Sequence, residues 1–133
     1  MLEPVPKEAI LVVDDDPSIR DALTSLLEER GYVVSAAVDG QEALDRLRGS
    51  SPPWLIVLDL MMPVMDGFEF RVRQLQDPTL AAIPVVVLSA GDLPRKVAPL
   101  GVAAWLPKPV EPATLLEIIE RLAYRRPAPD GGA

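Results

Sequence analysis

A run of five apolar residues, Trp54 to Leu58, is the feature that most restricts how this chain folds. So short a run without a polar residue is typical of a strand buried on both faces of a parallel sheet. Asp59 follows this run directly, and the turn signal Asp66-Gly67 comes shortly after. Because an ionised carboxylate is costly to bury without a partner, Asp59 is predicted to be a reactive or liganded group at a strand end.

Four further segments have the composition of strands, and helical patterns separate them. Because the strands alternate with helices and are apolar throughout, they predict an α/β fold with a parallel sheet covered on both faces. The predicted strands are residues 9–13, 32–37, 54–59, 84–89 and 102–105.

Helix signals occur in the intervening segments. Asp16 is a predicted N-cap with Pro17 at the first helical position, and Gly31 is a predicted stop. The sequence from Asp39 to Glu42 resembles a capping box. Later helices are predicted over about 67–75 and 112–124 from the spacing of their apolar residues. Their predicted inner faces are Phe68, Val72 and Leu75 in the former, and Leu115, Ile118, Ile119 and Leu122 in the latter.

The length of 133 residues fits one domain, predicted over residues 9–124. Residues 1–8 are a predicted extension without the apolar stretch of a signal peptide. Residues 125–133 are rich in Pro and Gly and are predicted to be a disordered tail. No apolar stretch reaches membrane-spanning length, so we expect a cytoplasmic protein.

Charge and missing residue types exclude several functions. The formal net charge of −7 argues against nucleic acid or an anionic membrane as a direct partner. The chain has no histidine and no cysteine, which excludes a Ser-His-Asp triad and a Cys/His zinc site. Chemistry must therefore come from acids, lysine, hydroxyls or a bound cation.

Polar residues of those types follow the predicted strands. Open parallel sheets bind ligands at the carboxyl ends of their strands. The residues predicted to meet there are Asp14, Asp15 and Asp16 after the first strand, Asp59 after the third, Ser89 after the fourth, and Lys108-Pro109 after the fifth.

This constellation resembles the receiver domain of two-component response regulators, the CheY-like family. The resemblance covers about Ala9 to Tyr124 and implies a flavodoxin-like, doubly wound, five-stranded sheet with strand order 2-1-3-4-5. The motifs that carry it are Ile10-Leu11-Val12-Val13-Asp14-Asp15, Leu58-Asp59-Leu60-Met61-Met62-Pro63 with Met65-Asp66-Gly67, Ser89-Ala90 and Lys108-Pro109.

The resemblance implies a role for each residue. Asp59 would be the phosphoryl acceptor and form an aspartyl phosphate. Asp14, Asp15, Asp59 and the backbone carbonyl of Met61 would hold Mg²⁺, a cation that needs oxygen ligands. An alternative for adjacent acids is a helix N-terminus, which favours negative charge, and Asp16 fits that alternative best.

Lys108 would reach Asp59 and later a phosphoryl oxygen, and the Lys108-Pro109 peptide would be cis. Ser89 would donate a hydrogen bond to the phosphoryl group. Trp105 stands where the family places an aromatic switch residue. Tyr or Phe is usual there, and the alternative is an indole fixed against the last helix.

A second departure from the family concerns the region before Lys108. Ser89 and Lys108 are 19 positions apart, about three fewer than usual, which corresponds to roughly one helical turn. The segment 91–100 also contains Pro94 and Pro99. The fourth helix is therefore predicted to be a single turn or lost, which alters a face that relatives use for dimers and targets.

The leading hypothesis is a stand-alone receiver, a signalling protein that catalyses only its own phosphorylation and dephosphorylation. Its partners would be a sensor histidine kinase or phosphotransfer protein and a separate downstream protein, and it would be a monomer or weak dimer. One alternative is a receiver-like interaction module that works without phosphorylation. Another is a phosphatase of the haloacid dehalogenase type with Asp14 as nucleophile, which would leave Asp59 unexplained.

Overall fold

The computed structural model describes residues 7–49, 51–91 and 97–125. Its parallel sheet has five strands in the order β2-β1-β3-β4-β5, as predicted from the resemblance. The strands are β1 (Lys7–Val13), β2 (Tyr32–Ala37), β3 (Leu55–Asp59), β4 (Val85–Ser89) and β5 (Ala104–Pro107).

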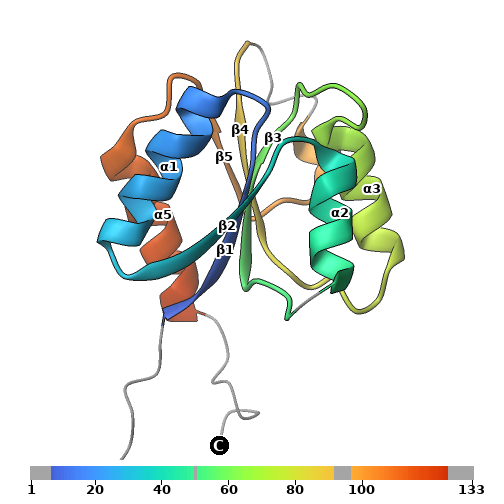
Figure 1. The fold of residues 1–133 in the computed structure, drawn as a ribbon, viewed down its shortest axis with the longest axis horizontal. Helices are drawn as coiled ribbons and strands as arrows, with labels where there is room; N and C mark the ends of the chain where they lie inside the picture. Colours follow the sequence, from blue (N-terminus) through green and yellow to red (C-terminus); the bar gives the residue numbers. More distant parts are fainter. Residues whose placement is uncertain (1–6, 50, 92–96, 126–133) are drawn as a thin grey trace, which may run out of the picture.

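Helices cover both faces of this sheet (Figure 1). The four α-helices among the described residues are α1 (Pro17–Glu29), α2 (Gly40–Gly49), α3 (Gly67–Gln76) and α5 (Pro112–Arg125). One apolar cluster lies between the sheet and α1 and α5, and a second lies between the sheet and α2 and α3. Side chains alternate between these two clusters along β1, β3 and β4, which is why the strand sequences are apolar throughout.

Aspartate side chains cap the first turns of α1 and α2, as the sequence predicts. The Asp16 carboxylate accepts hydrogen bonds from the backbone N–H groups of Ser18 and Ile19 at the start of α1. The Asp39 carboxylate accepts from the N–H of Glu42 at 2.8 Å. These bonds satisfy N–H groups that have no partner inside the helix.

Several predicted strand limits are wrong by one or two residues. β1 begins at Lys7 rather than residue 9, while β3 and β4 each begin one residue later than predicted. β5 covers Ala104–Pro107 rather than 102–105. The prediction ended this strand before Pro107. Proline has no backbone N–H to donate, but an edge strand tolerates it because one side of the strand makes no ladder hydrogen bonds.

The predicted inner face of α3 is also wrong. Val72 and Leu75 are 50% and 47% exposed, and only Phe68 is partly buried. The buried face contains Phe70, together with Gly67, Arg71 and Gln74. Hydrophobic spacing selected the wrong face because two large polar side chains point into the protein.

Arg71 and Gln74 are tolerated there because backbone carbonyls surround them. The Arg71 guanidinium donates to the carbonyls of Leu100 and Gly101 at 2.9 and 3.0 Å, and to Gln74 Oε1 at 2.7 Å. Gln74 Nε2 donates to the carbonyls of Leu80 and Ile83, each at 3.0 Å. The pair thus ties α3 to both chain segments that flank β4.

The region between β4 and β5 contains the 3₁₀ helix Ala98–Leu100, followed by Gly101 with φ of 61°. Four α-helices in the described residues fit the prediction of a shortened or missing fourth helix, although residues 92–96 lie outside those residues. The predictions for residues 1–6 and for residues 126–133 of the tail also fall outside them. The predicted start of the tail at Arg125 is wrong, because this residue is the last of α5.

The predicted inner face of α5 is correct at Leu115 and Ile119, which are fully buried. Ile118 and Leu122 are partly buried, and Leu116 is an additional buried residue. No helix in the described part of the chain is both long and apolar enough to cross a membrane.

Replacing Arg71 with methionine is expected to lower the free energy of unfolding by about 2 to 4 kcal/mol, because buried acceptors lose their donors. Urea denaturation measures this loss. The matched control is Arg73→Met on the same helix, where the arginine pairs with Glu69 at the surface. That change is expected to cost less than about 1 kcal/mol. Equal losses in the two variants would contradict the role assigned to the buried network.

Candidate functional site

Three carboxylates meet at the carboxyl edge of the sheet. Asp14 and Asp15 follow β1 and Asp59 ends β3, and these two strands pair directly, with Val13 opposite Leu58. One oxygen atom from each carboxylate lies within 4.8 Å of the others. Asp14 and Asp59 are buried, whereas Asp15 is exposed. The structure therefore brings together three of the four acids that the sequence predicted at this edge. Asp16 is not among them, because its carboxylate caps α1.

Lys108 connects the two buried acids. Its Nζ lies 3.0 Å from Asp14 Oδ2 and 3.2 Å from Asp59 Oδ1, and its side chain is 18% exposed. The backbone N–H of Lys108 donates to the carbonyl of Ser89 at 3.0 Å, which anchors the residue to the end of β4. The Lys108–Pro109 peptide is cis, as the resemblance implies.

The pKa of Asp59 is raised above its ordinary value. Burial is the main cause, and the negative charge of Asp14 adds to it. Lys108 and the backbone N–H of Met61, which donates to the Asp59 carboxylate, oppose the shift without cancelling it. Asp59 is therefore a carboxylate whose negative charge the fold only partly compensates.

The pKa of Lys108 is also raised. Burial alone lowers it, but the hydrogen bond to Asp14 and the negative charges of Asp59 and Asp14 raise it more. The ammonium group consequently stays charged at neutral pH and supplies a fixed positive charge between the two buried acids.

Ser89 is buried at the end of β4. β4 pairs with β3 so that Leu88 lies opposite Asp59, which places Ser89 one residue beyond the acid along the neighbouring strand. Its hydroxyl donates to the carbonyl of Ala90 at 3.4 Å, which is a long hydrogen bond.

Trp105 lies on β5 opposite Val87 and is 39% exposed. Val87 belongs to the cluster beneath α2 and α3, whereas the next residue, Leu106, packs with α5. Alternation along the strand thus puts Trp105 on the side of the sheet away from α5. This position does not fit the alternative of an indole fixed against the last helix.

The turn after Asp59 is held close to the end of β3. The N–H of Gly67 donates to the carbonyl of Leu60 at 2.9 Å, and the Asp66 carboxylate caps α3 by accepting from the N–H of Glu69. A Cβ on Gly67 would lie 2.5 Å from the carbonyl oxygen of Asp59. Only glycine permits this approach, so the Asp66-Gly67 turn signal reflects a packing requirement next to Asp59.

Sequence reasoning missed Arg20. Its Nη1 donates to the backbone carbonyl of Asp14 at 2.9 Å, from the first turns of α1. A basic residue six positions after Asp14, on the helix that leaves the acidic triplet, was the available signal. Apolar spacing on α1 did not include it.

The donor set suits a hard cation. Three carboxylates that converge at an accessible edge offer the oxygen ligands that Mg²⁺ prefers, and Asp15 faces solvent so that water ligands can remain. The side chains of Asp14, Asp15 and Asp59 therefore fit a magnesium ion. The backbone carbonyl of Met61 stays a predicted fourth ligand.

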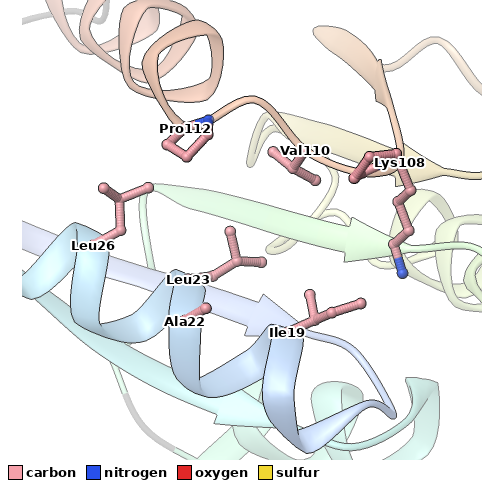
Figure 2. A pocket seen from close by; sticks show the side chains of 8 residues that line it. Ile19, Ala22, Leu23, Leu26, Lys108, Val110 and Pro112 are labelled. Atoms are coloured by element: carbon pink, nitrogen blue, oxygen red, sulfur yellow. The ribbon is translucent and has the colours of Figure 1, made fainter.

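An apolar groove of about 310 Å³ adjoins this cluster. Figure 2 shows its walls, formed by α1 on one side and by the chain from Lys108 to Pro112 on the other. The lining comprises Ile19, Ala22, Leu23, Leu26, Lys108, Pro109, Val110 and Pro112. The Lys108 side chain runs along the edge of the groove toward the end of β3 (Figure 2), where its nitrogen pairs with Asp14 and Asp59. The groove and the acidic cluster therefore have different chemistry.

Comparisons with known proteins agree with this geometry. The family model of the response regulator receiver domain matches residues 10–120. The response regulator MprA of Mycolicibacterium vanbaalenii is 46% identical over 127 residues, which are 93% of this chain and 53% of that protein. A 14.6 kDa protein of Leptolyngbya boryana is 40% identical over 121 residues, 89% of this chain and 92% of its own length.

Among solved structures, the chemotaxis response regulator CheY4 of Vibrio cholerae superposes with a TM-score of 0.80 and 34% identity. The match covers 87% of this chain and 98% of CheY4. This chain thus spans nearly the whole of CheY4 but only about half of MprA.

The raised pKa of Asp59 predicts a pH-dependent effect of Asp59→Asn on stability. The folded protein holds this proton more tightly than the unfolded chain, so the contribution of Asp59 is present at low pH and lost as pH rises through its raised pKa. In chelator-treated protein at pH 7, Asp59→Asn should therefore raise the melting temperature, by about 4 °C for each kcal/mol gained.

Thermal melts of both proteins between pH 4 and pH 7.5 measure this difference. It should shrink toward zero as the pH falls toward the ordinary pKa of an aspartic acid, which is about 3.9. Asp45→Asn on the exposed face of α2 serves as the control and should not show the trend. A melting temperature lowered at pH 7 by Asp59→Asn would contradict the assigned electrostatics.

Proposed function

Because this chain belongs to the response regulator receiver domain family of two-component systems, we propose that it accepts a phosphoryl group on Asp59. The observation that carries the proposal is the Lys108 ammonium, which lies within 3.2 Å of both Asp14 and Asp59 beside a third acid. A buried carboxylate with a raised pKa and a fixed cation at a strand end is a suitable nucleophile for a transferable group.

In the proposed reaction, an Asp59 oxygen attacks the phosphorus of a phosphohistidine on a sensor histidine kinase or phosphotransfer protein. The new P–O bond forms as the P–N bond breaks, and the imidazole leaves with the bonding electrons. Lys108 stabilises the negative charge on the phosphoryl oxygens, and Ser89 donates a hydrogen bond to one of them. Bound by Asp14, Asp15, Asp59 and the Met61 carbonyl, Mg²⁺ would neutralise further charge on the transferring group.

This proposal makes the chain a signalling domain, which catalyses only its own phosphorylation and dephosphorylation. Ser89 and Trp105 would convert the aspartyl phosphate into a conformational change, within a receiver domain over residues 9–124. The buried Ser89 hydroxyl with its long hydrogen bond and the exposed Trp105 on the adjacent strand support this part of the proposal. Membership of the receiver family gives no support to the dehalogenase-type alternative, in which Asp14 would be the nucleophile.

Phosphorylation tests the proposal directly. With MgCl₂ and acetyl phosphate, the protein is expected to gain the mass of one phosphoryl group, stable to acid and labile to base. Beryllofluoride, used in place of acetyl phosphate, should change the tryptophan fluorescence relative to the untreated protein, because the exposed Trp105 changes its surroundings. Intact-mass spectrometry and fluorescence measure the two effects.

Two variants complete the experiment. Asp59→Asn should gain no phosphoryl group, because its amide is a poor nucleophile, whereas the surface control Asp45→Asn should react like the wild type. If the wild type gains no mass, or if Asp59→Asn reacts equally well, Asp59 is not the acceptor. A wild type that gains no mass would favour an interaction module that works without phosphorylation, whereas an equally reactive Asp59→Asn would place the acceptor on another residue.

A further inference from the structure

Arg20 makes an unusual contact for a charged residue next to three acids. Its guanidinium does not pair with any of the three carboxylates in the cluster but donates through Nη1 to the backbone carbonyl of Asp14 at 2.9 Å. The side chain is half-buried and folds back from α1 toward the end of β1. Its positive charge is therefore used to hold the backbone rather than a carboxylate.

This contact adds to the hydrogen bonds that hold Asp14 in place. The carboxylate of Asp14 accepts from the backbone N–H of Asp16 through Oδ1 at 2.9 Å and from Lys108 through Oδ2 at 3.0 Å. Because Arg20 donates to the carbonyl of Asp14, hydrogen-bond donors hold both the side chain and the backbone of this residue. Asp14 thus has one defined orientation before any ligand binds.

The position of the Asp15 side chain depends on the same turn. It is exposed, so its position follows mainly from the backbone between β1 and α1. At one end of that backbone Arg20 donates a hydrogen bond to the Asp14 carbonyl. At the other end the Asp16 carboxylate accepts a hydrogen bond from the N–H of Ser18. Release of the Arg20 contact would free the peptide that joins Asp14 to Asp15.

From these contacts we infer that Arg20 is a positioning residue for the cation site, which orients Asp14 and Asp15 through the Asp14 carbonyl. The inference rests on the proposed function, since it assumes that these acids bind Mg²⁺. Groups that orient metal ligands without touching the metal commonly change metal affinity by tenfold or more.

The sign of the effect separates this role from simple electrostatics. A positive charge near a cation site repels the cation, so its removal by Coulomb's law alone would tighten Mg²⁺ binding. A positioning role predicts the opposite, because the two acids lose their fixed geometry. Arg20→Met, which removes the donor and keeps much of the side-chain volume, distinguishes the two.

The test is a titration of ¹⁵N-labelled protein with MgCl₂, followed by the amide shifts of residues 14–16 and 59–61. The Mg²⁺ dissociation constant of Arg20→Met should rise by about tenfold. The control Arg121→Met removes one charge from the exposed face of α5, where Arg121 pairs with Glu117, and should stay within about twofold of the wild type.

An unchanged or lower dissociation constant in Arg20→Met would overturn the inference while leaving the proposed site intact. A wild type without saturable shifts at these residues would instead overturn the site itself, and the role of Arg20 with it. Should Arg20→Met fail to fold, the wild type still gives an answer. Its Arg20 guanidinium protons should give separate, slowly exchanging signals at low temperature, and rapid averaging of those signals would refute the inference.

Discussion

The contact of the Lys108 ammonium with Asp14 and Asp59 is the interaction on which the site depends. Two buried carboxylates on adjacent strands repel each other and lose their hydration, which the fold tolerates only with an opposing charge. Lys108 supplies that charge from the far side of β4, held by its backbone bond to Ser89. The compensation of the Asp59 charge is incomplete, and the three acids outnumber the one lysine, which supports the cation site proposed at this edge of the sheet.

The rest of the architecture places groups around this contact. Direct pairing of β1 with β3 brings Asp14 beside Asp59, and the close approach of Gly67 to the Asp59 carbonyl sets the start of α3. α3 in turn carries Arg71, whose bonds to Leu100 and Gly101 hold the chain just before β5. The chain just before β5 is therefore tied to the same helix that begins next to Asp59.

Sequence patterns predicted the sheet, its helices and the convergence of Asp14, Asp15, Asp59 and Lys108, because apolar periodicity and strand-end position are local signals. They failed at the inner face of α3, where Arg71 and Gln74 are buried against carbonyls from distant segments. They also missed Arg20, since its partner is a backbone oxygen that no residue type reveals. These failures share one cause, which is that bonds to the backbone carry no hydrophobic pattern.

The central claim, that Lys108 stabilises the negative charge of Asp59, is tested most directly by a double-mutant cycle. The free energy of unfolding is measured in chelator-treated buffer for the wild type, Lys108→Met, Asp59→Asn and the double variant. We expect Asp59→Asn to stabilise the Lys108→Met protein more than the wild type, with a coupling energy of about 1 to 3 kcal/mol. Effects that add within about 0.5 kcal/mol would show that the two charges do not interact and would contradict this account.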